Sequence, residues 1–186
     1  MLSFQGSLRE KSFNKYLLEN LKDISEDIID LNIFDIADIP LYNEDLWNNP
    51  PSSVLNFKKD VDRYNSIIIS TPEYNYSYSG VLKNSIDWLS RNPNILNRKV
   101  VGIMGASTGA IGTARAQLLL RSTLATLNTY VMPKPEIFLS FAESKFSQDG
   151  KLTDKDSIDR IRIYSEEFVK FSSDFYKWRI LKSKPS

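Results

Sequence analysis

The stretch Ser66-Ile-Ile-Ile-Ser-Thr-Pro-Glu-Tyr-Asn-Tyr-Ser77 joins a run of β-branched residues to a polar, aromatic segment. Its three consecutive isoleucines predict a strand buried on both faces, as in a parallel sheet. Pro72 ends the strand because proline cannot donate a ladder hydrogen bond. Residues 71–77 then follow the carboxyl end of the strand, the edge at which open α/β sheets bind ligands. We therefore expect a ligand site there, and flat rings among amide groups suit a planar heterocycle with a polar rim.

Strand-like and helix-like patterns alternate along the rest of the chain. Strands are predicted at residues 1–5, 28–34, 66–70, 99–104 and 128–132, with Gly105 breaking the fourth. Helices are predicted at residues 13–24, 54–64, 80–91, 110–127 and after a turn at 148–150. This alternation predicts an α/β fold: a flavodoxin-like doubly wound five-stranded parallel sheet, order 2-1-3-4-5, with helices on both faces. No repeat or linker interrupts it, so we expect one domain over residues 1–186.

The composition excludes several classes of partner. The net charge of +1 gives no long-range attraction to nucleic acid or to an anionic membrane. No apolar segment approaches the roughly 18 residues that span a bilayer. Met1 runs directly into the first predicted strand and leaves no room for a signal peptide. We therefore expect a cytoplasmic protein without a nucleic-acid or membrane partner.

The chain contains neither cysteine nor histidine. Without them it has no thiolate nucleophile, no Ser-His-Asp triad, no imidazole proton shuttle and no usual zinc site. Catalysis must then use carboxylates, hydroxyls, Lys or Arg, or a bound cofactor. We expect no metal, and a cofactor that makes and breaks the bonds suits a chain with few reactive groups of its own.

A first chemistry-bearing segment, residues 6–14, lies between the first strand and the first helix. The unpaired N–H groups of a helix start form an anion site, to which Ser7, Ser12 and Asn14 add neutral donors. Arg9 adds a forked, charged donor for phosphate oxygens. The segment lacks the GxGxxG and GxxxxGK[ST] patterns, which favours a single terminal phosphate. Taken alone, a simple helix cap by Ser12 explains the segment equally well.

Two further loops follow the third and fourth strands. Residues 71–80 could place N–H groups near Glu73 to Asn75 at the polar edge of a ring system, with tyrosines packed beside its face. The alternative is that Tyr74, Tyr76 and Tyr78 are ordinary surface residues. Glu73 has no visible partner and is a poor candidate for a general base. Residues 105–115 carry three glycines that allow close backbone approach to a ligand, or that serve only helix–sheet packing.

The three loops converge on one edge of the predicted sheet. In the order 2-1-3-4-5, the first and third strands flank the topological switch point, where ligands bind. A phosphate site after the first strand and an aromatic loop after the third together describe FMN.

These segments also carry a family resemblance. Three groups of residues carry it: Gly6-Ser-Leu-Arg9 with Ser12-Phe-Asn14; residues 71–77 with Gly80-Val-Leu-Lys-Asn84 and 86–91; and Gly112 with Ala114-Arg115 and Gln117. Together they resemble the NADPH-dependent FMN reductase family, in its chromate, quinone and azo-dye reductase branch. The resemblance spans about residues 1–140 in matching order. It implies a bound FMN, NADPH or NADH as co-substrate, and two-electron transfer to a small-molecule acceptor such as a quinone, an azo compound or chromate. It also implies a homodimer or homotetramer that completes the flavin pocket.

Transferred residue by residue, the resemblance implies a set of FMN-binding positions. Its phosphate loop comprises Ser7, Leu8, Arg9, Ser12, Phe13 and Asn14. Its ring-binding positions are Pro72, Glu73, Tyr74, Asn75, Tyr76, Ser107 and Gly109. No side chain is expected to be catalytic, because the chemistry takes place at flavin N5. The first strand is shorter than relatives usually have, and we expect this to weaken FMN retention.

Two other functions fit the same residues. A reductase that supplies free reduced FMN would use flavin as a substrate and lose it on gel filtration. A flavodoxin-like electron carrier would need a partner protein and is usually strongly acidic, which a net charge of +1 disfavours.

Overall fold

A computed structural model of the chain describes residues 1–183. The strands are β1 Leu2–Gln5, β2 Asn32–Phe34, β3 Ser66–Ser70, β4 Val100–Ala106, β5 Tyr130–Val131 and β6 Ile137–Leu139. The helices are α1 Phe13–Ile24, α2 Ser52–Asp62, α3 Gly80–Ser90, α4 Ala114–Thr126 and α5 Lys155–Ser183, with short 3-10 turns η1 Glu44–Leu46 and η2 Ala142–Ser144.

The strands form one parallel sheet in the order β2-β1-β3-β4-β5, which confirms the predicted topology. The fifth position differs from the prediction of one strand at 128–132. Only Tyr130–Val131 pairs with the start of β4, while β6 pairs with its end, from Met104 to Ala106. Pro133 and Pro135 lie between β5 and β6, where residues without an N–H cannot continue the ladder. The sheet therefore has six strands in five positions.

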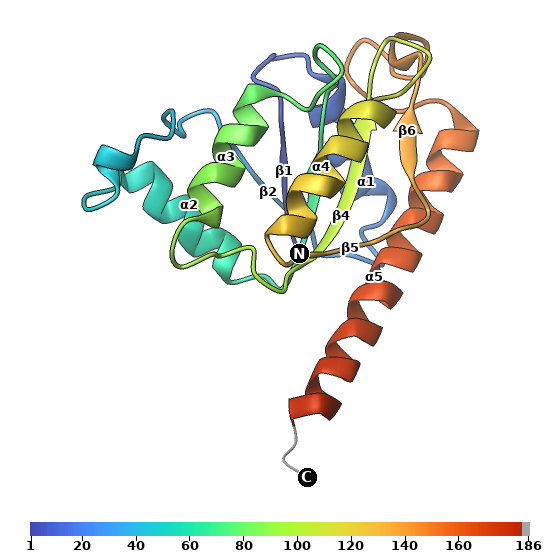
Figure 1. The fold of residues 1–186 in the computed structure, drawn as a ribbon. Helices are drawn as coiled ribbons and strands as arrows, with labels where there is room; N and C mark the ends of the chain where they lie inside the picture. Colours follow the sequence, from blue (N-terminus) through green and yellow to red (C-terminus); the bar gives the residue numbers. More distant parts are fainter. Residues whose placement is uncertain (184–186) are drawn as a thin grey trace.

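Helices cover both faces of this sheet, as predicted: α1 and α5 pack on one face and α2, α3 and α4 on the other (Figure 1). The isoleucines of β3 alternate between these layers. Ile67 and Ile69 belong to the core under α2, α3 and α4, and Ile68 belongs to the core under α1 and α5. Every residue of β3 is buried, so the isoleucine run predicted both the strand and its central place.

Two predicted boundaries next to the sheet edge were wrong. The fourth strand does not break at Gly105 but continues to Ala106. A β-carbon on Gly105 would lie 2.0 Å from Thr113 Oγ1, so glycine here permits a close approach of α4 to the strand. The fourth helix begins at Ala114, not at residue 110, because Thr113 before it has a left-handed backbone, with φ of 72°.

The second strand is also shorter than the predicted range of 28–34. The second strand is confined to Asn32–Phe34 because the chain before it turns, with Ile28 and Ile29 donating N–H bonds to Ser25. The last helix is a single 29-residue α5 that runs past the sheet (Figure 1).

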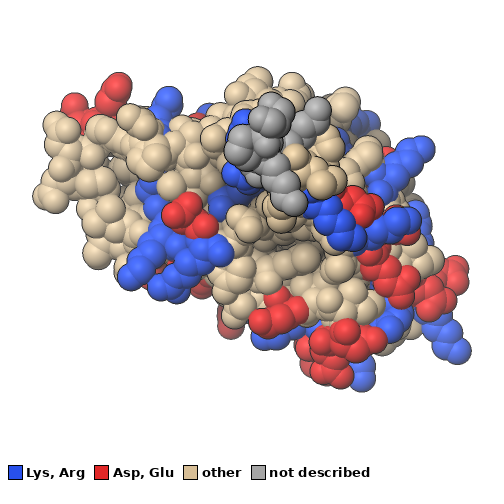
Figure 2. Space-filling view, turned by 90° about the horizontal axis from the view of Figure 1, so that it is seen from below, with Lys and Arg blue, Asp and Glu red and all other residues tan. Residues whose placement is uncertain are grey.

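The surface agrees with the small net charge. Figure 2 shows Lys, Arg, Asp and Glu interspersed on the face below the sheet, with no field of one sign. Among residues 1–183, no helix has the length and apolar character to cross a membrane.

Candidate functional site

The loops after β1, β3 and β4 meet at the carboxyl edge of the sheet around a cavity of about 150 Å³. It is lined by Ser7, Arg9, Ser12, Phe13, Asn14, Pro72, Glu73, Tyr74, Ala106, Ser107 and Thr108. The structure thus brings the three segments singled out from the sequence into one place. Their meeting follows from the parallel topology, which puts the carboxyl ends of adjacent strands side by side.

The first wall of the cavity is the turn into α1. Ser12 is the N-cap of this helix, and its hydroxyl accepts the N–H of Asn14 at 3.3 Å. The cap expected from the sequence is therefore present. It leaves N–H groups for an anion, because the first turn of a helix has more of them than one cap satisfies. Arg9 lies beside this turn with its guanidinium 5.8 Å from the ring centre of Phe13.

Ser7 lies between β1 and this helix. Its N–H donates to Gln5 Oε1 at 2.7 Å, and its hydroxyl accepts the N–H of Arg9 at 3.3 Å. These two bonds fold the chain into a tight turn directly after the strand. In the described chain, no hydrogen bond uses the proton of the Ser7 hydroxyl, so Ser7 and Arg9 are the candidate donors of this wall.

The side chain of Asn14, unlike those of the other predicted phosphate residues, is hydrogen-bonded to the ends of two strands. Its Nδ2 donates to the carbonyl of Ala106 at 3.0 Å, and its Oδ1 accepts the Ala106 N–H at 3.0 Å and the Ser70 hydroxyl at 2.9 Å. The side chain is buried and joins α1 to the ends of β3 and β4. Asn14 therefore shapes the floor of the cavity, with three protein partners for its amide.

The second wall is the loop after β3. Asn75 and Tyr76 both have left-handed backbones, with φ of 50° and 68°, and the loop closes through paired backbone bonds between Tyr74 and Ser77. This is the geometry of a type I′ turn, which favours Asn at its first central position. The Tyr74 N–H is used inside this turn. In the described chain, no hydrogen bond uses the N–H of Glu73 or Asn75, so these two remain available to a ligand edge.

Glu73 has partners that the sequence did not reveal. Its Oε2 accepts the backbone N–H groups of Arg115 and Ala116, at 3.1 and 3.2 Å, and so caps the start of α4. Its Oε1 lies 3.5 Å from the Arg115 guanidinium, which in turn lies 4.0 Å from the ring centre of Tyr76. Glu73 thus holds the β3 loop against α4. These contacts occupy the carboxylate, and that Glu73 is no general base stays a prediction.

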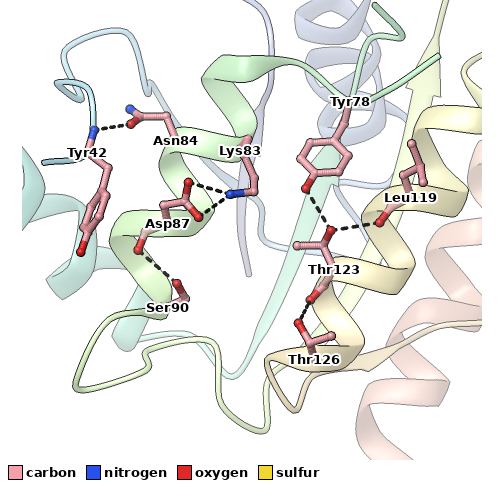
Figure 3. Close-up of polar contacts among 9 residues, drawn as sticks. All are labelled: Tyr42, Tyr78, Lys83, Asn84, Asp87, Ser90, Leu119, Thr123 and Thr126. Carbon is pink, nitrogen blue, oxygen red and sulfur yellow. Dashed lines mark hydrogen bonds and ion pairs between the residues drawn. The ribbon is translucent and has the colours of Figure 1, made fainter. Parts of the chain in front are cut away.

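The thirteen predicted positions divide into two groups. Nine line the cavity, namely Ser7, Arg9, Ser12, Phe13, Asn14, Pro72, Glu73, Tyr74 and Ser107. The other four, Leu8, Asn75, Tyr76 and Gly109, are exposed on the same edge. Sequence reasoning missed Ala106 and Thr108, although both stand in the segment around Ser107. Tyr78 lies away from the cavity and directs its hydroxyl to Thr123 on α4, at 2.9 Å (Figure 3).

The cavity fits the phosphate end of FMN. Arg9, the hydroxyls of Ser7 and Ser12 and the start of α1 offer a charged donor, neutral donors and a helix dipole to one anion. Ligand pockets usually have about 300–1,000 Å³, so a cavity of 150 Å³ would enclose only part of FMN. The ring system would extend over the exposed tyrosines. The described residues contain no cluster of acidic side chains able to hold a metal ion.

A second, larger groove of about 500 Å³ lies between α2 and the end of α3. It is lined mainly by apolar groups such as Trp47 and Trp88, with Lys58 over the Trp47 ring at 4.8 Å. Burial lowers the pKa of Lys58. This groove does not include the strand ends at which the three loops meet, so the smaller cavity remains the candidate site.

Comparison with known proteins agrees with this geometry. The family model "NADPH-dependent FMN reductase" matches residues 1–144. The chain is 41% identical over 156 residues to an NAD(P)H-dependent FMN reductase of Pseudomonas aeruginosa, covering 83% of this chain and 84% of that protein. It is 39% identical over 166 residues to a quinone reductase of Escherichia coli K12, covering 87% and 88%.

A solved structure gives the same result. FerB, a flavoenzyme NAD(P)H:(acceptor) oxidoreductase of Paracoccus denitrificans, superposes with a TM-score of 0.87 at 33% identity, covering 94% of this chain and 97% of that one. The family model covers more than half of the chain, and several relatives exceed 30% identity over most of it. The chain therefore belongs to the NADPH-dependent FMN reductase family.

Proposed function

We propose that this protein is an FMN-dependent NAD(P)H oxidoreductase that passes two electrons from NAD(P)H to quinones. One observation carries the proposal: the anion-binding turn at Ser7 to Ser12 and the ring loop at Pro72 to Tyr74 line the same cavity. In the overall reaction, NAD(P)H and one proton reduce a quinone to a hydroquinone, and NAD(P)⁺ is released. Relatives at 34–41% identity that are named as quinone or FMN reductases support it.

Bound FMN supplies the redox chemistry, because it accepts a hydride at N5 and returns two electrons to an acceptor. The chain supplies position and electrostatics. Ser7, Arg9 and the start of α1 bind the phosphate and so fix the ligand at one end. The N–H groups of Glu73 and Asn75, which no hydrogen bond uses in the described chain, would stabilise negative charge at the edge of a ring bound beside this loop.

We expect no side chain at the site to act as an acid or base. The Glu73 carboxylate is engaged by the start of α4 and by Arg115. Tyr74 is exposed at the rim. The residues therefore orient two ring systems in turn, which gives ping-pong kinetics: NAD(P)H binds and leaves before the acceptor takes its place.

The test uses the full chain purified with and without added FMN. We expect a yellow protein whose flavin absorbance is bleached by NAD(P)H without oxygen and restored by a quinone. Steady-state rates with menadione should give parallel double-reciprocal lines. A protein that binds no added FMN, or whose bound flavin NAD(P)H fails to bleach, would contradict the proposal. Flavin retained through gel filtration separates this function from the supply of free reduced FMN.

Azo compounds and chromate are further proposed acceptors, because the rim beside the cavity is exposed. We also propose a homodimer or homotetramer. Leu118 and Leu119 on α4 are 69% and 45% exposed, close to the Arg115 that holds the ring loop. Apolar surface of this kind is often covered by a second copy. Light scattering after gel filtration tests this, and a cytoplasmic location stays a prediction.

A further inference from the structure

Phe141 combines two unfavourable features at the edge of the sheet. It follows β6 with a left-handed backbone, φ 52° and ψ 45°, a conformation that a bulky residue rarely adopts. Its side chain is 55% exposed. In the described part of the chain, its ring takes part in no ring–ring contact. A glycine or asparagine would adopt this backbone at lower cost, so folding alone does not explain an aromatic residue here.

The backbone around Phe141 is attached to the loop after β4. The Phe141 N–H donates to the carbonyl of Gly109 at 3.2 Å, and the next residue, Ala142, donates to the carbonyl of Ser107 at 3.0 Å. The Ser107 N–H donates in turn to Leu139 at 2.9 Å. The two loops lie side by side at the upper edge of the sheet (Figure 1). Phe141 is therefore held at a fixed place beside the wall of the candidate site.

Its position relative to the cavity follows from these contacts. Ser107 and Thr108 line the cavity on the β4 side, and Phe141 is hydrogen-bonded to the residue that follows them. Tyr74, 53% exposed, lines the same cavity from the β3 loop. The edge thus carries an exposed aromatic ring next to each of its two ring-binding loops. Exposed aromatic rings on a backbone held by hydrogen bonds suit a flat ligand that arrives and leaves, because stacking on them needs little ordering of the main chain.

We propose that Phe141 is a specificity residue for the electron acceptor, and that its ring contacts planar quinones as they bind at the rim. This inference rests on the proposed function. The contact favours ring-shaped acceptors over compact inorganic ones, which have no face to stack on. The backbone bonds to Ser107 and Gly109 hold residues 141 and 142 beside the loop after β4.

Two variants test this, each loaded with FMN. Phe141→Leu keeps an apolar side chain without the aromatic face. Phe141→Asn removes the ring and suits the left-handed backbone, so it should fold at least as well as the original. Trp178→Leu, which removes an exposed ring from α5, is the matched control.

We expect both Phe141 variants to raise KM for menadione by about 2- to 12-fold, the range of a typical ring–ring contact. The KM for ferricyanide, the FMN dissociation constant from flavin fluorescence and the rate of flavin bleaching by NADPH should change less than twofold. Trp178→Leu should change none of them.

The assignment would be overturned by an unchanged KM for menadione or by an equal rise for ferricyanide. Weaker FMN binding would overturn it too, because Phe141 would then be part of the cofactor cradle. A changed oligomeric state would likewise assign the ring to contacts between copies. Failure of the proposed function is distinct, because the unsubstituted protein would then show no NAD(P)H–quinone activity at all.

Discussion

Glu73 and Arg115, 42 positions apart in sequence, are joined twice: through the backbone N–H of Arg115 at 3.1 Å and through its guanidinium at 3.5 Å. Glu73 is only 13% exposed at its side chain, so this carboxylate is shielded from water. The pair connects the loop that would hold the flavin ring to the start of α4. The shape of the ring loop therefore depends on the position of a helix.

Replacing Glu73 with Ala should loosen this loop. The variant loses an N-cap acceptor and an ion pair, and we expect a loss of about 1–2 kcal/mol in the free energy of unfolding. Glu73→Gln keeps an acceptor without the charge and should lose less. FMN should bind more weakly to both, as measured by quenching of flavin fluorescence. Glu26→Ala, on the exposed surface, is the control. Normal FMN affinity in Glu73→Ala would show that the loop does not need the carboxylate.

Arg9 should distinguish FMN from riboflavin, which lacks the phosphate. Charged hydrogen bonds to phosphate are stronger than neutral ones, so Arg9→Ala should weaken FMN binding by about tenfold. Riboflavin binding should stay the same. The exposed neighbour Lys11 gives a control, because Lys11→Ala makes the same change in net charge. Equal losses of FMN and riboflavin affinity would remove Arg9 from the phosphate site.

The sequence predicted the order of the sheet because its strongest signal lies in the middle strand. Three isoleucines in succession suit only a strand covered on both faces, and all are fully buried in β3. It could not predict β6, which has three residues, follows Pro135 and depends on pairing with Met104 to Ala106 of a distant strand. Short strands carry no periodicity, and only the tertiary contact reveals them.

The candidate site also contains residues whose place the sequence could predict and contacts that it could not. Ser7, Arg9 and Ser12 could be predicted because they follow a strand and start a helix, where local geometry leaves N–H groups unpaired. The contact between Glu73 and the start of α4 could not be predicted, because nothing in the local sequence indicates which helix start lies opposite a loop. The role of Asn14 was obscured for the same reason. An amide near a helix start suits a ligand contact and a tertiary contact equally well.

Asn14 should act as a structural residue rather than as a phosphate ligand. Asn14→Ala leaves buried polar groups of Ser70 and Ala106 without partners, and we expect a loss of about 2–3 kcal/mol in the free energy of unfolding. The ratio of FMN to riboflavin affinity should stay unchanged, in contrast to Arg9→Ala. Asn48→Ala, an exposed position, serves as the control. A fall in that ratio would assign Asn14 to the phosphate.

Asp154 should make stability depend on pH at the start of α5. Its Oδ2 accepts the N–H of Ser157 at 3.0 Å and lies 3.6 Å from Lys145 Nζ. The hydrogen bond from the Ser157 hydroxyl, followed by its backbone N–H and the charge of Lys145, holds the pKa of Asp154 below its ordinary value. A lowered pKa in the folded state means that the ionised form stabilises the fold. This contribution is present above the ordinary pKa of 3.8 and is lost as pH falls through the lower folded value.

Asp154→Ala should lower the free energy of unfolding by about 1 kcal/mol at neutral pH, as the loss of a helix cap usually does. Asp154→Asn should keep most of the cap yet lose this acid sensitivity. Denaturant unfolding at a series of pH values from about 7 to about 2 measures both, because the series must pass below the ordinary pKa of 3.8. An Asn variant as acid-sensitive as the original would show that other carboxylates carry the effect.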